Sequence, residues 1–175
     1  MTAVRKIFKN ATTSQSAVQE ALAFVFTQEL LLPSEHVFVV APWISNIPIL
    51  DNHQGGFAAL NPEWPRADIH FVEVLATLAT RGAQLHLHVG TDSHNRYFES
   101  KLKEALTDAG VSAQCQWKAH RHLHTKGILT DQVLVSGSMN FTRNGIRLLD
   151  ESVDICFASE IVGEARAHFE SYEHA

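Results

Sequence analysis

The sequence predicts a single α/β domain over residues 1–175, in which helices flank both faces of a mixed, largely parallel sheet. Of the 175 residues, 45% are hydrophobic, which is enough to bury one core, and the chain is too short for two ordinary domains. Short apolar runs alternate with segments in which apolar residues recur at helical spacing. Strands that are separated by helices indicate a largely parallel or mixed sheet that is covered on both faces.

The first part of the chain predicts one helix, one strand and one long loop. Residues 14–32 read as an amphipathic helix, because apolar side chains recur near helical spacing from Ala17 to Leu32. Residues 36–41, which a proline ends, read as a buried strand. The segment 46–65 contains three prolines and a Gly-Gly pair, so we expect it to be irregular. It leaves the C-terminal end of the first strand, where α/β proteins tend to bind ligands.

The remaining elements alternate in the same way. Helical spacing predicts helices at 67–79, 93–109 and 160–172. Arg81-Gly82 closes the first of them and Gly110 the second. Apolar runs between these helices predict strands at 84–89, 111–117 and 152–157.

Four polar side chains are predicted to gather along one edge of a hairpin. His124 and Lys126 are two apart on an extended segment, so they point the same way. The apolar run 133–135 reads as the return strand, and Ser138 and Asn140, again two apart, follow it. An imidazole, an ammonium, a hydroxyl and a carboxamide together suit a phosphate ester, which needs a nucleophile or acid, a cation and neutral donors.

These residues resemble the HKD motif of the phospholipase D superfamily. The matching positions are His124-x-Lys126, Asp131 and Gly137-Ser138-x-Asn140. Six positions at set spacings make the match specific. The family usually has six residues between its Asp and its Gly-Ser, whereas residues 132–136 supply five. We assign the shortening to a tighter turn at Asp131-Gln132, because a deletion inside the return strand would turn Ser138 and Asn140 to the other face.

A downstream acid resembles a second feature of the family, the carboxylate that orients the catalytic imidazole. Glu151 stands at the matching position before the strand-like run 152–157, and Asp150 is the competing candidate. A carboxylate that accepts from one ring nitrogen fixes the tautomer, frees the other nitrogen to attack and stabilises the imidazolium. Without the motif upstream, the same pair would be interpreted as a solvated acidic turn.

The resemblance implies a metal-independent phosphodiesterase without a cofactor. The family's chemistry uses two such motifs, one histidine as nucleophile and the other as general acid, and this chain contains one motif. The short single-motif members that the chain resembles build the site from two identical subunits, so we expect a homodimer that shares His124 of each chain. The favoured function is a nuclease with a phosphohistidine intermediate, since the family's lipid enzymes mostly carry both motifs in one chain.

The resemblance also gives the motif residues their expected roles. Lys126 and Asn140, supported by Ser138, stabilise the charge on the phosphoryl oxygens. Asp131 and Gly137 are expected to be structural. Candidate substrate-binding residues near the motif are Arg121, His122 and Arg143. Three tryptophans are either stacking platforms for bases or core residues: Trp43, Trp64 and Trp117.

Two other functions stay open. A lipid or small-molecule phosphodiesterase of the phospholipase D type would use the same residues. A non-catalytic phosphodiester-binding subunit of a larger nucleic-acid or defence complex would fit the net charge of −5 and the shortened motif. A net negative charge is not typical of a protein that grips nucleic acid over its whole surface. Basic residues around the motif would nevertheless suffice for a few phosphate contacts.

The histidine pattern offers a metal-binding alternative. His120, His122 and His124 alternate, as do His86 and His88, and three imidazoles on one strand face could bind zinc. Alternating polar residues more commonly mark an exposed or half-buried face, and zinc would leave the rest of the motif unexplained. We therefore expect no metal.

The expected location is the cytoplasm, without contact to a membrane. No apolar run follows the basic N-terminal residues, and no stretch approaches the length of a membrane span. Cys115 and Cys156 lie in strand-like segments without CxxC or zinc spacing, which is typical of buried, reduced thiols.

Overall fold

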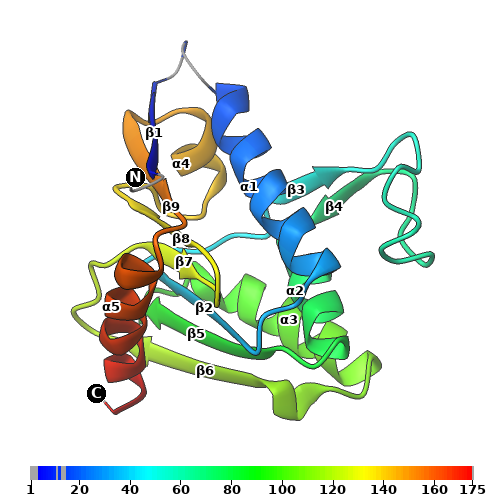
Figure 1. The fold of residues 1–175 in the computed structure, drawn as a ribbon. Helices are drawn as coiled ribbons and strands as arrows, with labels where there is room; N and C mark the ends of the chain where they lie inside the picture. Colours follow the sequence, from blue (N-terminus) through cyan, green and yellow to red (C-terminus); the bar gives the residue numbers. More distant parts are fainter. Residues whose placement is uncertain (1–3, 11, 13–14, 175) are drawn as a thin grey trace.

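The computed structural model describes residues 4–10, 12 and 15–174, and its centre is a seven-stranded mixed sheet (Figure 1). Its strands are β1 (Val4–Lys9), β2 (His36–Ala41), β5 (Gln84–Gly90), β6 (Cys115–His120), β7 (Gly127–Leu129), β8 (Leu134–Gly137) and β9 (Glu151–Cys156). Their order across the sheet is β1-β9-β8-β7-β2-β5-β6. A separate two-stranded sheet contains β3 (Pro48–Asp51) and β4 (Asp68–His70).

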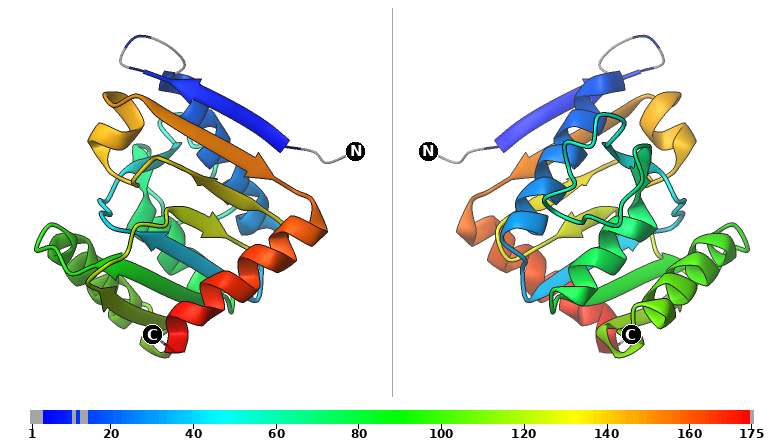
Figure 2. Two further views of the ribbon diagram at one scale, coloured as in Figure 1. Left: turned by 90° about the vertical axis from the view of Figure 1, so that its left-hand side faces the viewer. Right: turned by 90° about the vertical axis from the view of Figure 1, so that its right-hand side faces the viewer.

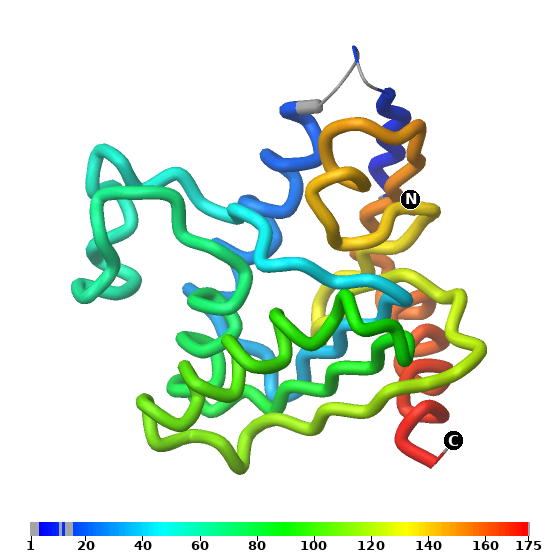
Figure 3. The backbone as a smooth tube through the Cα atoms, turned by 180° about the vertical axis from the view of Figure 1, so that it is seen from behind, coloured from blue at the N-terminus to red at the C-terminus, as the bar shows by residue number. Residues whose placement is uncertain are grey.

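Helices flank both faces of the main sheet, as predicted. One face carries α1 (Gln15–Leu31), α2 (Phe71–Thr80) and α3 (Asn95–Asp108), and the other carries α5 (Ser159–Glu170) (Figure 2). The short elements are α4 (Arg143–Arg147) and the 3-10 turns η1 (Ser112–Gln114) and η2 (Ser171–His174). Figure 3 shows the segment between β3 and β4 projecting away from the main sheet. Among the described residues, no helix is both long and apolar enough to cross a membrane.

The expectation of a largely parallel sheet is only partly right. The pairs β2–β5 and β5–β6 are parallel, because α2 and α3 lie between these strands in sequence and provide the crossovers. The pairs β1–β9, β9–β8, β8–β7 and β7–β2 are antiparallel. The motif hairpin explains part of this difference, since strands joined by a tight turn must run in opposite directions. The motif therefore lies in the antiparallel half of the sheet.

The predicted helices and strands are confirmed, with shifted boundaries. The predicted helix at 14–32 is α1, although residue 14 lies outside the described residues. β6 begins at Cys115 because η1 occupies the preceding residues. α2 begins at Phe71 rather than at residue 67, because residues 68–70 form β4. β4 pairs with β3, which lies inside the segment 46–65 that was expected to be irregular.

β1 is an edge strand that the sequence analysis missed. Three of its six residues are basic, which hides the apolar alternation. Ile7 and Lys9 nevertheless point inward and are buried, and the strand pairs along its whole length with β9. The consequence is that Lys9 lies opposite Glu151, the first residue of β9.

β2 is buried on both faces and separates two hydrophobic clusters. Val37 and Val39 belong to the larger cluster beneath α1, α2 and α3. Phe38 and Val40 belong to the smaller cluster beneath α5, where the ring centroids of Phe38 and Phe169 are 6.3 Å apart. Side chains alternate between the faces of a strand, so one short apolar run serves both clusters.

Gly137 ends β8 at a position where only glycine fits. Its φ is +148°, which side-chain-bearing residues rarely adopt. A Cβ atom there would lie 2.0 Å from the carbonyl oxygen of Ser152 on the neighbouring strand. The absence of a side chain therefore allows β8 to approach β9 closely just before Ser138.

We predict that Gly137→Ala lowers the free energy of unfolding by about 2–4 kcal/mol, from backbone strain and forced separation of the strands. Gly163→Ala on α5 is the matched control, because a Cβ there meets no atom within 4 Å. Alanine is the better helix former, so this control should be neutral or stabilising by up to about 1 kcal/mol. Urea denaturation measures the free energy of unfolding of both variants. Equal changes in Gly137→Ala and Gly163→Ala would contradict the special role of Gly137.

Candidate active site

The motif hairpin turns at Asp131-Gln132, where the sequence predicts it. β7 and β8 pair up to the turn, with Leu129 opposite Leu134. The N–H of Thr130 donates to the carbonyl of Val133 at 2.9 Å and closes the turn. The pairing on both sides of the turn is regular, as expected if the shortening of the motif falls in the turn.

Asp131 connects the turn to two neighbouring segments. Its carboxylate accepts a hydrogen bond from the backbone N–H of Glu35 at 2.7 Å and pairs with Arg166 of α5 at 2.5 Å. Its own N–H donates to the hydroxyl of Ser34 at 3.0 Å. The contacts of Asp131 therefore hold the hairpin against α5 and against the loop before β2.

His124 and Lys126 lie in the segment that leads into β7, which begins at Gly127. The Lys126 ammonium donates to the carbonyl of His124 at 2.7 Å. The His124 side chain is exposed, and among the described residues its ring has no hydrogen-bond partner. The imidazole is therefore open to a substrate or to a second subunit.

Ser138 and Glu151 meet where β8 and β9 lie side by side. The Ser138 hydroxyl donates to the Glu151 carboxylate and accepts from the N–H of Ser152 at 3.0 Å. The backbone N–H of Ser138 also donates to the carbonyl of Ser152, at 3.0 Å. Within the described part of the chain, the carboxylate of Glu151 thus contacts Ser138 rather than the His124 ring that the sequence analysis paired with it.

Glu151 interacts electrostatically with two lysines. Burial lowers the pKa of Lys126, and the charge of Glu151 offsets part of that shift. Burial likewise lowers the pKa of Lys9, with smaller opposing effects from Glu151 and Asp150. The Lys9 ammonium donates to the carbonyl of Leu149 at 2.6 Å. Sequence reasoning missed Lys9 because its strand carries a weak apolar signal.

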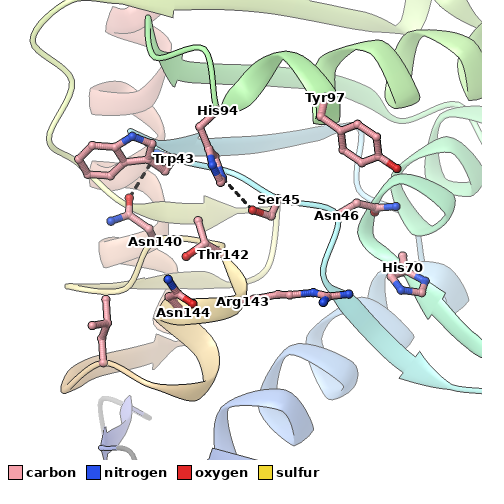
Figure 4. Close-up of a pocket in the computed structure, with 11 residues that line it drawn as sticks. Trp43, Ser45, Asn46, His70, His94, Tyr97, Asn140, Thr142, Arg143 and Asn144 are labelled. Carbon is pink, nitrogen blue, oxygen red and sulfur yellow. Dashed lines mark hydrogen bonds between the residues drawn. The ribbon is translucent and has the colours of Figure 1, made fainter.

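Asn140 lies at the edge of a cavity of about 660 Å³ (Figure 4). Its side-chain oxygen accepts from the backbone N–H of Trp43 at 3.4 Å, and its carbonyl accepts from the N–H of Thr142 at 2.8 Å. Arg143, one of the predicted substrate-binding residues, lines the same cavity. Asn140 thus connects the motif to the segment that follows β2.

The other two predicted substrate-binding residues lie elsewhere. Arg121 and His122 line a second cavity, of about 490 Å³, together with His124 and Tyr172. The Tyr172 hydroxyl donates to the hydroxyl of Thr125 at 2.7 Å and so ties the C-terminal segment to the residue after His124. Sequence reasoning missed Tyr172, because no local pattern shows that η2, the turn after α5, reaches the motif.

His86 and His88 share one face of β5, as their alternation predicts, and both contact Glu173 of η2. The closest distances to its carboxylate oxygen are 2.6 Å from His86 and 3.3 Å from His88. The rings of His88 and His120 are joined by a contact of 3.1 Å between their nitrogens. Burial lowers the pKa of His88. His86 and His88 therefore attach η2 to β5, and His88 also connects β5 to His120 of β6.

The three alternating histidines of the zinc alternative all line the second cavity, but among the described residues their ring nitrogens do not lie close enough together to hold one ion. His120 contacts His88 on β5, whereas His122 and His124 are exposed. Where the structure describes the chain, the one group of three potential metal ligands with converging donor atoms is exposed and lies elsewhere: Asp51, His53 and Asp68.

The fold and the motif hairpin together define a phospholipase D-like domain. The family model described as "Cardiolipin synthase, PLD-like domain" matches residues 57–172, a span that contains the whole motif and Glu151. The chain therefore belongs to the phospholipase D superfamily. No curated protein matches the sequence.

Several solved structures share the fold at low sequence identity. Nuc from Salmonella typhimurium, a phospholipase D family member, has a TM-score of 0.59 and 11% identity, over 98% of this chain and 93% of Nuc. NucT from Helicobacter pylori has a TM-score of 0.60 and 11% identity, over 97% of this chain and 95% of NucT. Phosphatidylserine synthase from Haemophilus influenzae has a TM-score of 0.54 and 16% identity, over 98% of this chain and 38% of the synthase.

We predict that Glu151→Gln lowers the pKa of Lys126 further. The Glu151 carboxylate favours the ammonium form, so its removal leaves the effect of burial unopposed. Asp150→Asn is the matched control: its charge acts on Lys9 and should leave Lys126 unchanged. An NMR titration of the lysine side-chain carbons from pH 7 to 11 measures both shifts. A larger shift of Lys126 in Asp150→Asn than in Glu151→Gln would contradict the geometry.

Proposed function

We propose that this chain is a nuclease, a metal-independent phosphodiesterase that cleaves nucleic acid in a site shared by two identical subunits. The observation that carries the proposal is the group formed by Lys126, Ser138 and Glu151, within a superfamily member whose His124 is exposed. These side chains offer a cation, a hydroxyl, a carboxylate and a nucleophile. That set can act on a phosphodiester through protein groups alone.

In the proposed reaction, one ring nitrogen of His124 attacks the phosphorus. A nitrogen–phosphorus bond forms and the bond from phosphorus to the leaving oxygen breaks, while the imidazolium of the partner subunit's His124 gives its proton to that oxygen. The same imidazole then takes a proton from water, and the resulting hydroxide attacks the phosphorus and releases His124. The two histidines end in their starting protonation states.

The remaining motif residues receive supporting roles in the proposal. Lys126 and Asn140 stabilise the charge that builds on the phosphoryl oxygens. Ser138 holds the Glu151 carboxylate and so sets its position. Glu151 favours the ammonium form of Lys126 and stabilises the imidazolium when a second subunit and substrate complete the site. Asp131 and Gly137 maintain the hairpin and its approach to β9.

The surface charge near the motif supports a nucleic-acid substrate. The chain has a net charge of −5, but Arg121, Arg143 and Arg147 are exposed close in sequence to the motif. A few basic side chains on an acidic body suffice for local phosphate contacts and make binding sensitive to salt. We propose the cytoplasm as the location of such a protein.

A lipid phosphodiesterase is the second candidate. The description of the matching family model and the fold shared with a phosphatidylserine synthase favour it. It would use the same motif residues on a different phosphodiester.

We predict that the protein cleaves single-stranded DNA or RNA at an undiminished rate in millimolar EDTA. His124→Ala should slow cleavage by roughly 10³-fold or more, since it removes nucleophile and acid together. His53→Ala, which removes an exposed imidazole outside the motif, should leave the rate unchanged. The measurement is gel-resolved cleavage of labelled oligonucleotides, beside phosphatidylglycerol as a lipid substrate.

Each alternative gives a different result in this assay. Activity that disappears with EDTA and returns with zinc would contradict the metal-independent mechanism. Cleavage of the lipid without cleavage of nucleic acid would favour the second candidate. Tight binding of nucleic acid without any cleavage would indicate a non-catalytic subunit of a larger complex.

We predict that mixed dimers of wild-type and His124→Ala subunits are nearly inactive, because each site needs a histidine from both chains. After subunit exchange at equal concentrations, the sample should keep about a quarter of the activity of an all-wild-type sample. Independent sites would instead keep about half. Analytical ultracentrifugation checks that dimers are present, and a fully active monomer would rule out the shared site.

A further inference from the structure

The cavity beside Asn140 is assembled from four separate segments, one of which contributes His70 of β4 (Figure 4). Trp43 comes from the segment after β2, Tyr97 from α3, and Arg143 from α4. An isolated bridge between Ile44 and Phe141 holds the segment after β2 beside the end of the motif. The volume of about 660 Å³ lies in the range of small-ligand sites.

The lining of this cavity is basic or neutral, although the chain is acidic overall. Arg143 carries a permanent positive charge, His70 and His94 carry one when protonated, and none of the lining residues is an aspartate or a glutamate. Figure 4 shows Arg143 extending toward the side of the cavity where His70 lies. Three carboxamides supply both donors and acceptors: Asn46, Asn140 and Asn144. Such a lining suits an anion that also has polar edges.

Two exposed aromatic rings stand at opposite sides of the cavity (Figure 4). Trp43 is 44% exposed and Tyr97 is 66% exposed. Of the three tryptophans, Trp64 is buried in the core, and Trp117 stacks on Phe98 with ring centroids 6.2 Å apart. The face of Trp43 is therefore the one available for stacking.

The Trp43 indole lies beside Asp92, and the Trp43 backbone is bonded to Asn140. Asp92 accepts from the backbone N–H of His94 at 2.8 Å, and this bond, followed by the nearby indole of Trp43, lowers the pKa of Asp92. The His94 ring contacts the hydroxyl of Ser45 at 2.9 Å. An aromatic ring that is oriented before binding loses little conformational freedom when a ligand stacks on its face.

We propose that this cavity binds two consecutive nucleotides of an unpaired strand next to the scissile phosphate. Trp43, which contacts Asn140 of the motif, stacks on the base nearer to that phosphate, and Tyr97 stacks on the following base. Arg143 pairs with the phosphate between them. A base can lie on these rings only when it has left a duplex stack, so the cavity selects single-stranded substrate. This inference rests on the proposed nuclease function.

The test is a binding experiment in the His124→Ala background, so that the oligonucleotide is not cleaved. Fluorescence anisotropy gives the dissociation constant of a labelled single-stranded oligonucleotide at fixed salt, with one abasic position moved along it. Two neighbouring abasic positions should each weaken binding by about 5- to 150-fold, because each removes one stacked base. Trp43→Leu should abolish the penalty at one position, and Tyr97→Leu at the other.

Matched variants separate stacking from folding defects. Trp43→Phe keeps a ring and should restore most of the abasic penalty. Phe24→Leu removes an equally exposed aromatic ring from α1 and should change nothing. Because binding is read without cleavage, failure of the cavity model is distinguishable from failure of the proposed function.

Three outcomes would overturn the inference. If the wild type binds the oligonucleotide and both leucine variants bind equally well with unchanged penalties, the cavity is not the nucleotide site. If these variants lose binding to phosphatidylglycerol vesicles instead, the cavity recognises a lipid. If the wild type neither binds nor cleaves nucleic acid, the proposed nuclease function is wrong, and so is the inference that rests on it.

Discussion

The double-sided burial of β2 is the constraint on which the rest of the structure depends. Its side chains alternate between the cluster beneath α1, α2 and α3 and the cluster beneath α5, so both helical layers are anchored on one strand. On one side β2 pairs in parallel with β5, and on the other it pairs antiparallel with β7. β2 therefore joins the parallel half of the sheet to the antiparallel half that holds the motif.

Close approach of β8 to β9 shapes the candidate site. Gly137 permits that approach, and the next residue, Ser138, then binds Glu151 at the start of β9. The same carboxylate offsets part of the pKa decrease that burial causes in two lysines: Lys126, which lies in the loop before β7, and Lys9, which lies on the edge strand β1. The negative charge of this one carboxylate favours the ammonium form of both partly desolvated lysines.

The C-terminal segment and the segment after β2 approach the motif from different elements. Tyr172 bonds to Thr125, and nearby Glu173 bonds to His86 and His88 of β5, so the end of the chain is attached both to the sheet and to the loop with His124. In the segment after β2, the backbone N–H of Trp43 donates a hydrogen bond to the Asn140 side chain. The motif is thus supported by residues that are distant from it in sequence.

The helices, most of the strands and the motif could be predicted from the amino-acid sequence, because all of them depend on short-range regularities. Apolar periodicity revealed α1, α2, α3 and α5 and most strands, and set spacings revealed His124, Lys126, Ser138 and Asn140. The tertiary structure decided how these parts meet: the antiparallel half of the sheet, the edge strand with Lys9, the bond from Ser138 to Glu151, and the exposed ring of Trp43. Strand order and burial depend on contacts between residues far apart in the chain, and a local pattern of residue types carries no information about which distant segment fills the space beside it.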